Sequence, residues 1–76
     1  MTVIAQKGEI ITLSMVSDGN HFWHIVRVSR AKMPLLDKMI RSGEVDVKEL
    51  GDVLHSGWGK EPPASLRESL EQSSAA

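Results

Sequence analysis

The sequence contains neither cysteine nor tyrosine, and its aromatic side chains other than histidine are Phe22, Trp23 and Trp58. Without cysteine the chain has no disulfide framework, no thiolate metal ligand and no thiol nucleophile. A disulfide-stabilised secreted mini-protein is therefore excluded, and a reducing cytoplasm is a compatible location. Stability must come from a hydrophobic core or from association with a second copy of the chain.

Long apolar runs and an excess of one charge sign are also missing. No stretch approaches the roughly 20 apolar residues that span a bilayer, and the first residues lack the basic lead and apolar run of a secretory signal. The net charge is −1 over 76 residues, which argues against polyanion binding by the chain as a whole. We expect a cytoplasmic protein that has no membrane partner.

The sequence does contain a strong turn signal at Asp18-Gly19. This pair suits the two central positions of a type I′ turn, which both require positive φ. The turn would pair Met15 with Phe22 and so fix which side chains share each face of a hairpin. One face is apolar and carries Ile11, Leu13, Met15, Phe22, His24 and Val26; the mixed face carries Ile10, Thr12, Ser14, Trp23, Ile25 and Arg27.

A further strand and a first helix flank this hairpin. Residues 2–6 are rich in β-forming residues and end at Lys7-Gly8, where a tight turn would place Ile4 opposite Ile11 in a three-stranded meander. The helix begins near Met33-Pro34, because proline suits the first helical turn, and ends at Gly43.

A second helix is expected after Asp46, which can serve as its N-cap. Val47, Leu50, Val53 and Leu54 would form its buried face. Gly57 would end the helix, and Trp58 would fold back over it as a structural lid. Gly51 weakens such a helix by up to about 1 kcal/mol relative to alanine, which suggests that it lies close to another backbone segment.

Residues 64–72 predict a third helix with only two large apolar side chains, Leu66 and Leu70, so that it needs a docking site. The expected fold class is α+β, with an antiparallel β-hairpin or three-stranded meander followed by two to three short helices. Residues 1–60 would form a single α+β domain, and residues 61–76 a proline-led C-terminal helix with a tail that frays at 73–76. The expected core is Ile4, Ile11, Leu13, Met15, Phe22, Val26, Val28, Leu36, Met39, Ile40, Leu50, Val53, Leu54 and Trp58.

Residues that could perform catalysis or bind a metal are scattered. His21 and His24 point to opposite faces of one strand, and His55 lies elsewhere in the chain. Ser56 is adjacent to His55 on the expected helix, where neighbouring side chains diverge by about 100°. Residues 56–60 lack the full spacing of a phosphate-binding loop. We therefore expect no catalytic, cofactor-binding or metal-binding residues, and a protein that is not an enzyme.

The mixed hairpin face is the best candidate for a contact surface. Aromatic and arginine side chains are enriched at the centres of protein interfaces, and this face carries Ile10, Trp23, Ile25 and Arg27. The sequence favours a small protein-interaction or regulatory module, homodimeric and bound to a protein partner through this outer face of the ribbon. The competing interpretation is that the third helix covers the same face within one chain.

A nucleic-acid-binding accessory protein is the alternative function. Trp23 could stack on a base, and the basic stretch Arg27–Arg41 could hold phosphates through Arg27, Arg30 and Lys32. The slightly acidic total charge and the absence of a recognition helix count against this alternative.

Overall fold

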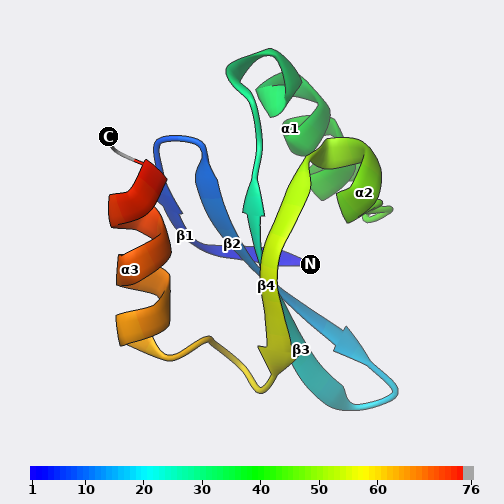
Figure 1. Ribbon diagram of the computed structural model, residues 1–76. Coiled ribbons are helices and arrows are strands. Elements are labelled where there is room, and N and C mark those ends of the chain that lie inside the picture. Colours follow the sequence, from blue (N-terminus) through cyan, green and yellow to red (C-terminus); the bar gives the residue numbers. More distant parts are fainter. Residues whose placement is uncertain (75–76) are drawn as a thin grey trace.

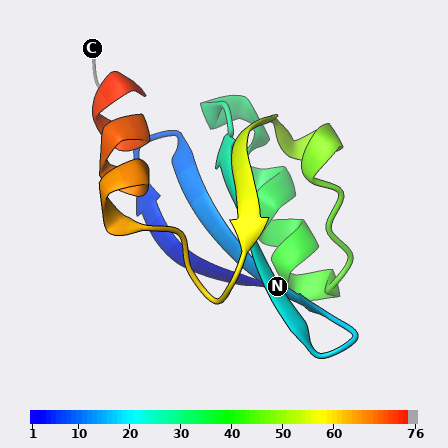
Figure 2. The same ribbon diagram turned by 60° about the horizontal axis from the view of Figure 1, so that its bottom comes forward.

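The computed structural model describes residues 1–74 as a four-stranded antiparallel sheet with helices on both faces. The elements in chain order are β1 (Thr2–Lys7), β2 (Ile10–Ser17), β3 (Asn20–Arg27), η1 (Arg30–Lys32), α1 (Met33–Ser42), α2 (Val47–Leu50), β4 (Asp52–Trp58) and α3 (Ala64–Ser74). The strands are ordered β1-β2-β3-β4, a simple meander (Figure 1). Figure 2 shows α3 on one side of the sheet and α1 with α2 on the other. The α+β class and the strand meander agree with the expectation, and the meander has a fourth strand.

The β2–β3 hairpin has the register that the Asp18-Gly19 turn predicts. Asp18 and Gly19 adopt φ angles of 52° and 81°, as the central residues of a type I′ turn require. Met15 pairs with Phe22, and the pairing continues without a shift to the far end of both strands. The two faces of the hairpin are therefore composed as the sequence indicates.

The first strand differs from the prediction in its turn and in its register. The turn is formed by Gly8, with φ 58°, and Glu9, one residue later than the expected Lys7-Gly8 turn. The pairing of the two strands also shifts between Val3 and Ala5. Because the turn lies one residue later, Gln6 rather than Ile4 pairs with Ile11, and Ile4 is the extra residue of the bulge farther along the strand. The predicted core position of Ile4 is wrong, and its side chain is 40% exposed.

The helix α1 packs its apolar side on the face of the sheet that the sequence assigned to the core. Pro34 lies in its first turn, and Gly43 ends it in the left-handed conformation (φ 80°) with its N–H donating to the Met39 carbonyl at 2.9 Å. Ile40 is 39% exposed, so its predicted core position is wrong. The buried cluster on this face comprises Ile11, Leu13, Val26, Val28, Leu36, Met39 and Leu50. Each aliphatic side chain buried here contributes roughly 1.5–3 kcal/mol to folding.

The predicted second helix is correct at its start and wrong after Leu50. The Asp46 carboxylate accepts a hydrogen bond from the Lys48 backbone N–H at 3.0 Å, as an N-cap should, but α2 is only four residues long. At Gly51 the backbone becomes extended, and residues 52–58 join the sheet as its edge strand β4. A Cβ at Gly51 would overlap the backbone carbonyl of Arg27, which confirms the predicted close approach.

Formation of β4 moves two predicted core residues to the surface. Val53 is 41% exposed, and Trp58 is 78% exposed instead of covering a helix. Leu54, also predicted in the core, is half-buried and packs on the opposite face of the sheet. A tertiary contact with β3 has overridden the local helical pattern here.

The third helix, α3, lies against the face of the sheet opposite α1 and α2. Its Leu66 and Leu70 pack on a second buried cluster formed by Ile10, Trp23 and Ile25. Pro62, in the segment that leads from β4 to the helix, is also buried. The predicted fraying of residues 73–76 falls in part on 75–76, which lie outside the described residues.

Candidate functional site

The hairpin face predicted to bind a partner is covered by the chain's own α3. Ile10 and Ile25 are 0% exposed and Trp23 is 4% exposed. The expectation that these side chains form an open surface is therefore wrong, and the competing interpretation, a third helix docked on this face, is confirmed. The two leucines of α3 pack against these three large apolar side chains, so their apolar surface is removed from water. This contact stabilises α3, which is too short to be stable as an isolated helix.

Trp23 is held in place from several sides. Its indole stacks on the His55 ring with centroids 5.7 Å apart and 18° between planes. A Cβ at Gly57 would lie 2.8 Å from the indole Cε2, so only glycine leaves room for this ring. Trp23 is thus a core residue of the α3 side of the sheet and is not accessible to a partner while α3 is docked.

The basic residues of the nucleic-acid alternative, Arg27, Arg30 and Lys32, are exposed at the end of β3 and in η1. Carboxylates are interleaved with them. Glu9 Oε2 accepts the backbone N–H of Arg30 at 3.2 Å, and Glu9 and Asp52 line the same small hollow as Arg27 and Lys32. The structure therefore brings these cations together in a surface of mixed charge, and the buried Trp23 adds no exposed ring to it.

A different surface is open, at the hairpin end of the sheet on the α1–α2 face. In Figure 1 the β2–β3 hairpin extends at the lower right, away from α1 and α2 at the top. The two helices cover the other end of this face, where the buried cluster lies. Adjacent strands place four side chains on the uncovered end: Phe22 and His24 from β3, and Ser56 and Trp58 from β4. We call these four residues the aromatic surface.

The side chains of the aromatic surface contact one another through polar and ring contacts. Phe22 meets Trp58 with ring centroids 6.0 Å apart and 64° between planes, and it meets His24 at 5.5 Å and 81°. Nδ1 of His24 and Oγ of Ser56 are hydrogen-bonded at 2.6 Å. Partial burial lowers the pKa of His24 below 6.5, because removal from water disfavours the charged ring. His24 is therefore mainly neutral at pH 7.

A hollow of about 480 Å³ opens over these side chains. Apart from His24, none of its lining residues can carry a charge; they are Ser17, Phe22, Trp23, His24, Ser56, Gly57 and Trp58. A serine hydroxyl bonded to a histidine is one part of a nucleophilic site, but such a site also needs a group that orients the histidine. The lining supplies no carboxylate for that purpose. The chemistry offered is apolar contact with a few neutral hydrogen-bonding groups.

This surface was missed because residues 52–56 were expected to continue a helix that ends at Gly57, whereas residues 52–58 form β4. On that helix Ser56 had His55 as its neighbour, whereas the structure pairs it with His24 across two strands. The signal that could have revealed β4 is the pair of glycines, Gly51 and Gly57, which bracket a stretch of strand length and are poor helix residues.

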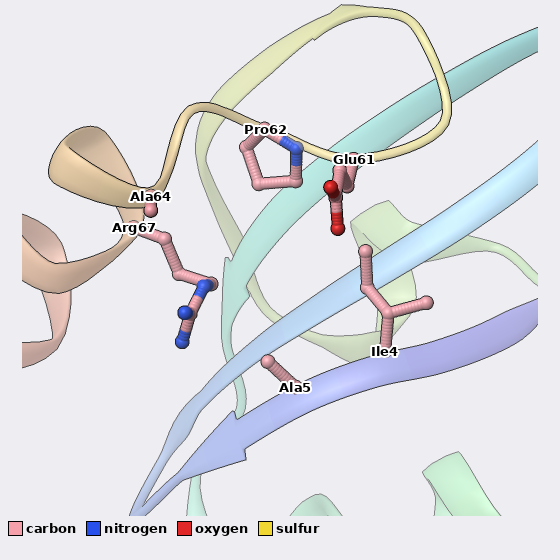
Figure 3. A pocket seen from close by; sticks show the side chains of 6 residues that line it. All are labelled: Ile4, Ala5, Glu61, Pro62, Ala64 and Arg67. Atoms are coloured by element: carbon pink, nitrogen blue, oxygen red, sulfur yellow. The ribbon is translucent and has the colours of Figure 1, made fainter.

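A second hollow, of about 230 Å³, lies between β1 and the segment after β4. Figure 3 shows the Glu61 side chain directed from this segment toward Ile4, and Arg67 reaching from α3 toward Ala5. Arg67 is already paired with the Glu71 carboxylate at 3.2 Å on the same helix. The lining of this hollow thus contains one acidic and one basic side chain, Glu61 and Arg67. The hollow lies beside the contact of Pro62 and α3 with the sheet.

Among the residues that the structure describes, no group of three or more histidine and carboxylate side chains is placed to hold a metal ion. Over the same residues, none of the helices has the length and apolar character needed to cross a membrane. Comparison with protein-family models, with curated proteins and with solved structures finds no match to this chain.

Proposed function

We propose that this protein is a small, non-enzymatic protein-interaction module whose contact surface is the aromatic surface at the hairpin end of the sheet. The observation that supports it is the exposure of Trp58, a side chain that is 78% accessible. A large exposed aromatic beside Phe22 is the kind of anchor that dominates protein interfaces. Exposed apolar clusters on small domains commonly mark partner-binding sites.

This proposal moves the predicted contact from one face of the ribbon to the other. The sequence favoured Trp23 and its neighbours, which bind α3 in the same chain. Phe22 and Trp58 lie on the opposite face, and the register of β3 with β4 places them as direct partners. The cytoplasmic location, the regulatory role and the homodimer expected from the sequence remain predictions.

Selection from a random phage-displayed peptide library tests the proposal, because the partner need not be known beforehand. We expect enriched peptides that bind the wild-type chain and lose at least tenfold in affinity for Trp58→Ala. Val16→Ala is the matched control, since Val16 is 61% exposed and lies on the other face of the hairpin. Enriched peptides that bind Trp58→Ala as well as wild type, or no enrichment at all, would contradict the proposal.

Self-association is measured separately by size-exclusion chromatography with light scattering. If the partner is a second copy, wild type is a dimer and Trp58→Ala a monomer at the same concentration. A dimer that survives both Trp58→Ala and Phe22→Ala would use another surface and would count against the aromatic surface as the contact site.

A further inference from the structure

We propose that the aromatic surface recognises a proline-rich segment of a partner protein in the polyproline II conformation. This inference rests on the proposed function and specifies the chemistry of the partner. Three properties of the surface support it: its lack of charge, the angles between its rings, and the kind of hydrogen-bonding groups it presents.

The lining of the hollow selects against charged ligands. It carries no lysine, arginine or carboxylate, and His24 is mainly neutral at pH 7 because its pKa is lowered by burial. A charged ligand group would lose hydration at this surface without gaining an opposite charge. An acidic peptide, a nucleic-acid backbone or a basic peptide therefore finds no complementary group here, whereas an uncharged apolar segment does.

The rings form concave corners. Phe22 stands at 64° to Trp58 and at 81° to His24, so the three rings offer corners between steep walls. A nucleobase stacks best on a flat exposed face. A compact, puckered pyrrolidine ring contacts both walls of such a corner at once, and aromatic-lined grooves are the surfaces that proline-rich segments use.

The available hydrogen-bonding groups match a ligand that offers acceptors. The indole N–H of Trp58 is a donor only. Nδ1 of His24 and Oγ of Ser56 are already bonded to each other at 2.6 Å. In the tautomer in which the Ser56 hydroxyl donates to Nδ1, the Nε2–H of His24 is a second donor. A polyproline II segment has carbonyl oxygens free to accept and no internal hydrogen bonds, and its prolines have no N–H that would need an acceptor.

Preorganisation favours the same ligand. The hollow is a shallow surface feature of about 480 Å³, which can bury only part of a peptide and so leaves little free energy to order a flexible one. Proline-rich segments already populate the bound conformation when free, so less conformational entropy is lost on binding.

The test uses two synthetic peptides of equal length, one of Pro-Pro-Leu repeats and one of Gly-Gly-Leu repeats. Each is titrated into the ¹⁵N-labelled 76-residue chain. The Trp58 indole N–H signal reports the site, because Trp58 is exposed. The backbone amide signal of Leu50, which lies in the buried cluster at the other end of the same face, is the internal control. We expect the Trp58 signal to shift while the Leu50 amide signal stays, with the Gly-Gly-Leu peptide binding at least tenfold more weakly. We also expect binding, followed through backbone amides, to fall at least tenfold in Trp58→Ala and to persist in Val16→Ala.

Each other outcome overturns the inference. Equal binding of both peptides through Trp58 would show general apolar recognition, so that the interaction function survives and the polyproline proposal fails. Shifts that persist unchanged in Trp58→Ala place the peptide elsewhere. If neither peptide binds, the polyproline proposal fails, and the separate library selection decides the interaction function. If the free chain already buries Trp58 in a dimer, the occupant is a second copy.

Discussion

Replacing Gly51 with alanine should destabilise the protein by about 3 kcal/mol, at the upper end of typical overpacking costs. The added Cβ would overlap the carbonyl oxygen of Arg27 and lie 3.0 Å from its carbonyl carbon and 3.3 Å from the Cα of Val28. All three atoms belong to the backbone, so a side-chain rotation cannot relieve the collision. The strands β3 and β4 must shift apart instead, which weakens interstrand hydrogen bonds worth about 1 kcal/mol each.

The backbone of Gly51 is extended, with φ 175°, so alanine suffers no conformational strain there. Gly8→Ala is the opposite control, because Gly8 has φ 58° and nothing within 4 Å of the added methyl group; it should cost about 1 kcal/mol from the left-handed conformation alone. Urea unfolding followed by circular dichroism measures the free energy of unfolding of both variants, and the Gly51 variant should also melt about 12–24 °C lower. A Gly51→Ala protein as stable as wild type, or stabilised by the roughly 0.4–1 kcal/mol that alanine gives where it fits, would refute the close contact between β3 and the start of β4.

Other substitutions test the two faces of the sheet. Leu66→Ala should cost about 1–3 kcal/mol, less than a fully buried leucine, and should shift the tryptophan emission to the red as α3 loosens. Thr12→Val should raise the free energy of unfolding by about 1 kcal/mol, because the buried Thr12 hydroxyl has no partner among residues 1–74. Trp58→Ala should change that free energy by less than about 1 kcal/mol, since the side chain is largely exposed. The pKa of His24 is lower in the folded protein than 6.5. The contribution of His24 to the free energy of unfolding is therefore complete above pH 6.5 and is lost as the pH falls through the folded-state pKa. His24→Gln should remove that part of the pH dependence of urea unfolding.

The parts of the fold that could be predicted from the sequence are those decided by neighbouring residues. The Asp18-Gly19 turn sets the hairpin register through two positive φ angles, and the local signals of Pro34 and Gly43 set both ends of α1. In each case a few consecutive residues carry the physical cause.

The parts that could not be predicted depend on contacts between distant segments. Residues 47–54 have the spacing of an amphipathic helix, yet the chain becomes extended at Gly51, where β4 meets the backbone of Arg27. The same change turns Trp58 from an expected lid into the most exposed of the large apolar side chains. Whether the mixed hairpin face is open or covered depended on where α3 docks, which Leu66 and Leu70 suggest but do not determine alone.

Accessibility of the two indoles to a soluble paramagnetic probe is the most direct test of the account. Trp58 at 78% exposure should lose its indole N–H signal at low probe concentration, while Trp23 at 4% exposure beneath α3 should keep its signal. The reverse pattern, or strong broadening of both signals, would contradict the assignment of α3 to the Trp23 face and remove the structural basis for the aromatic surface as the contact site.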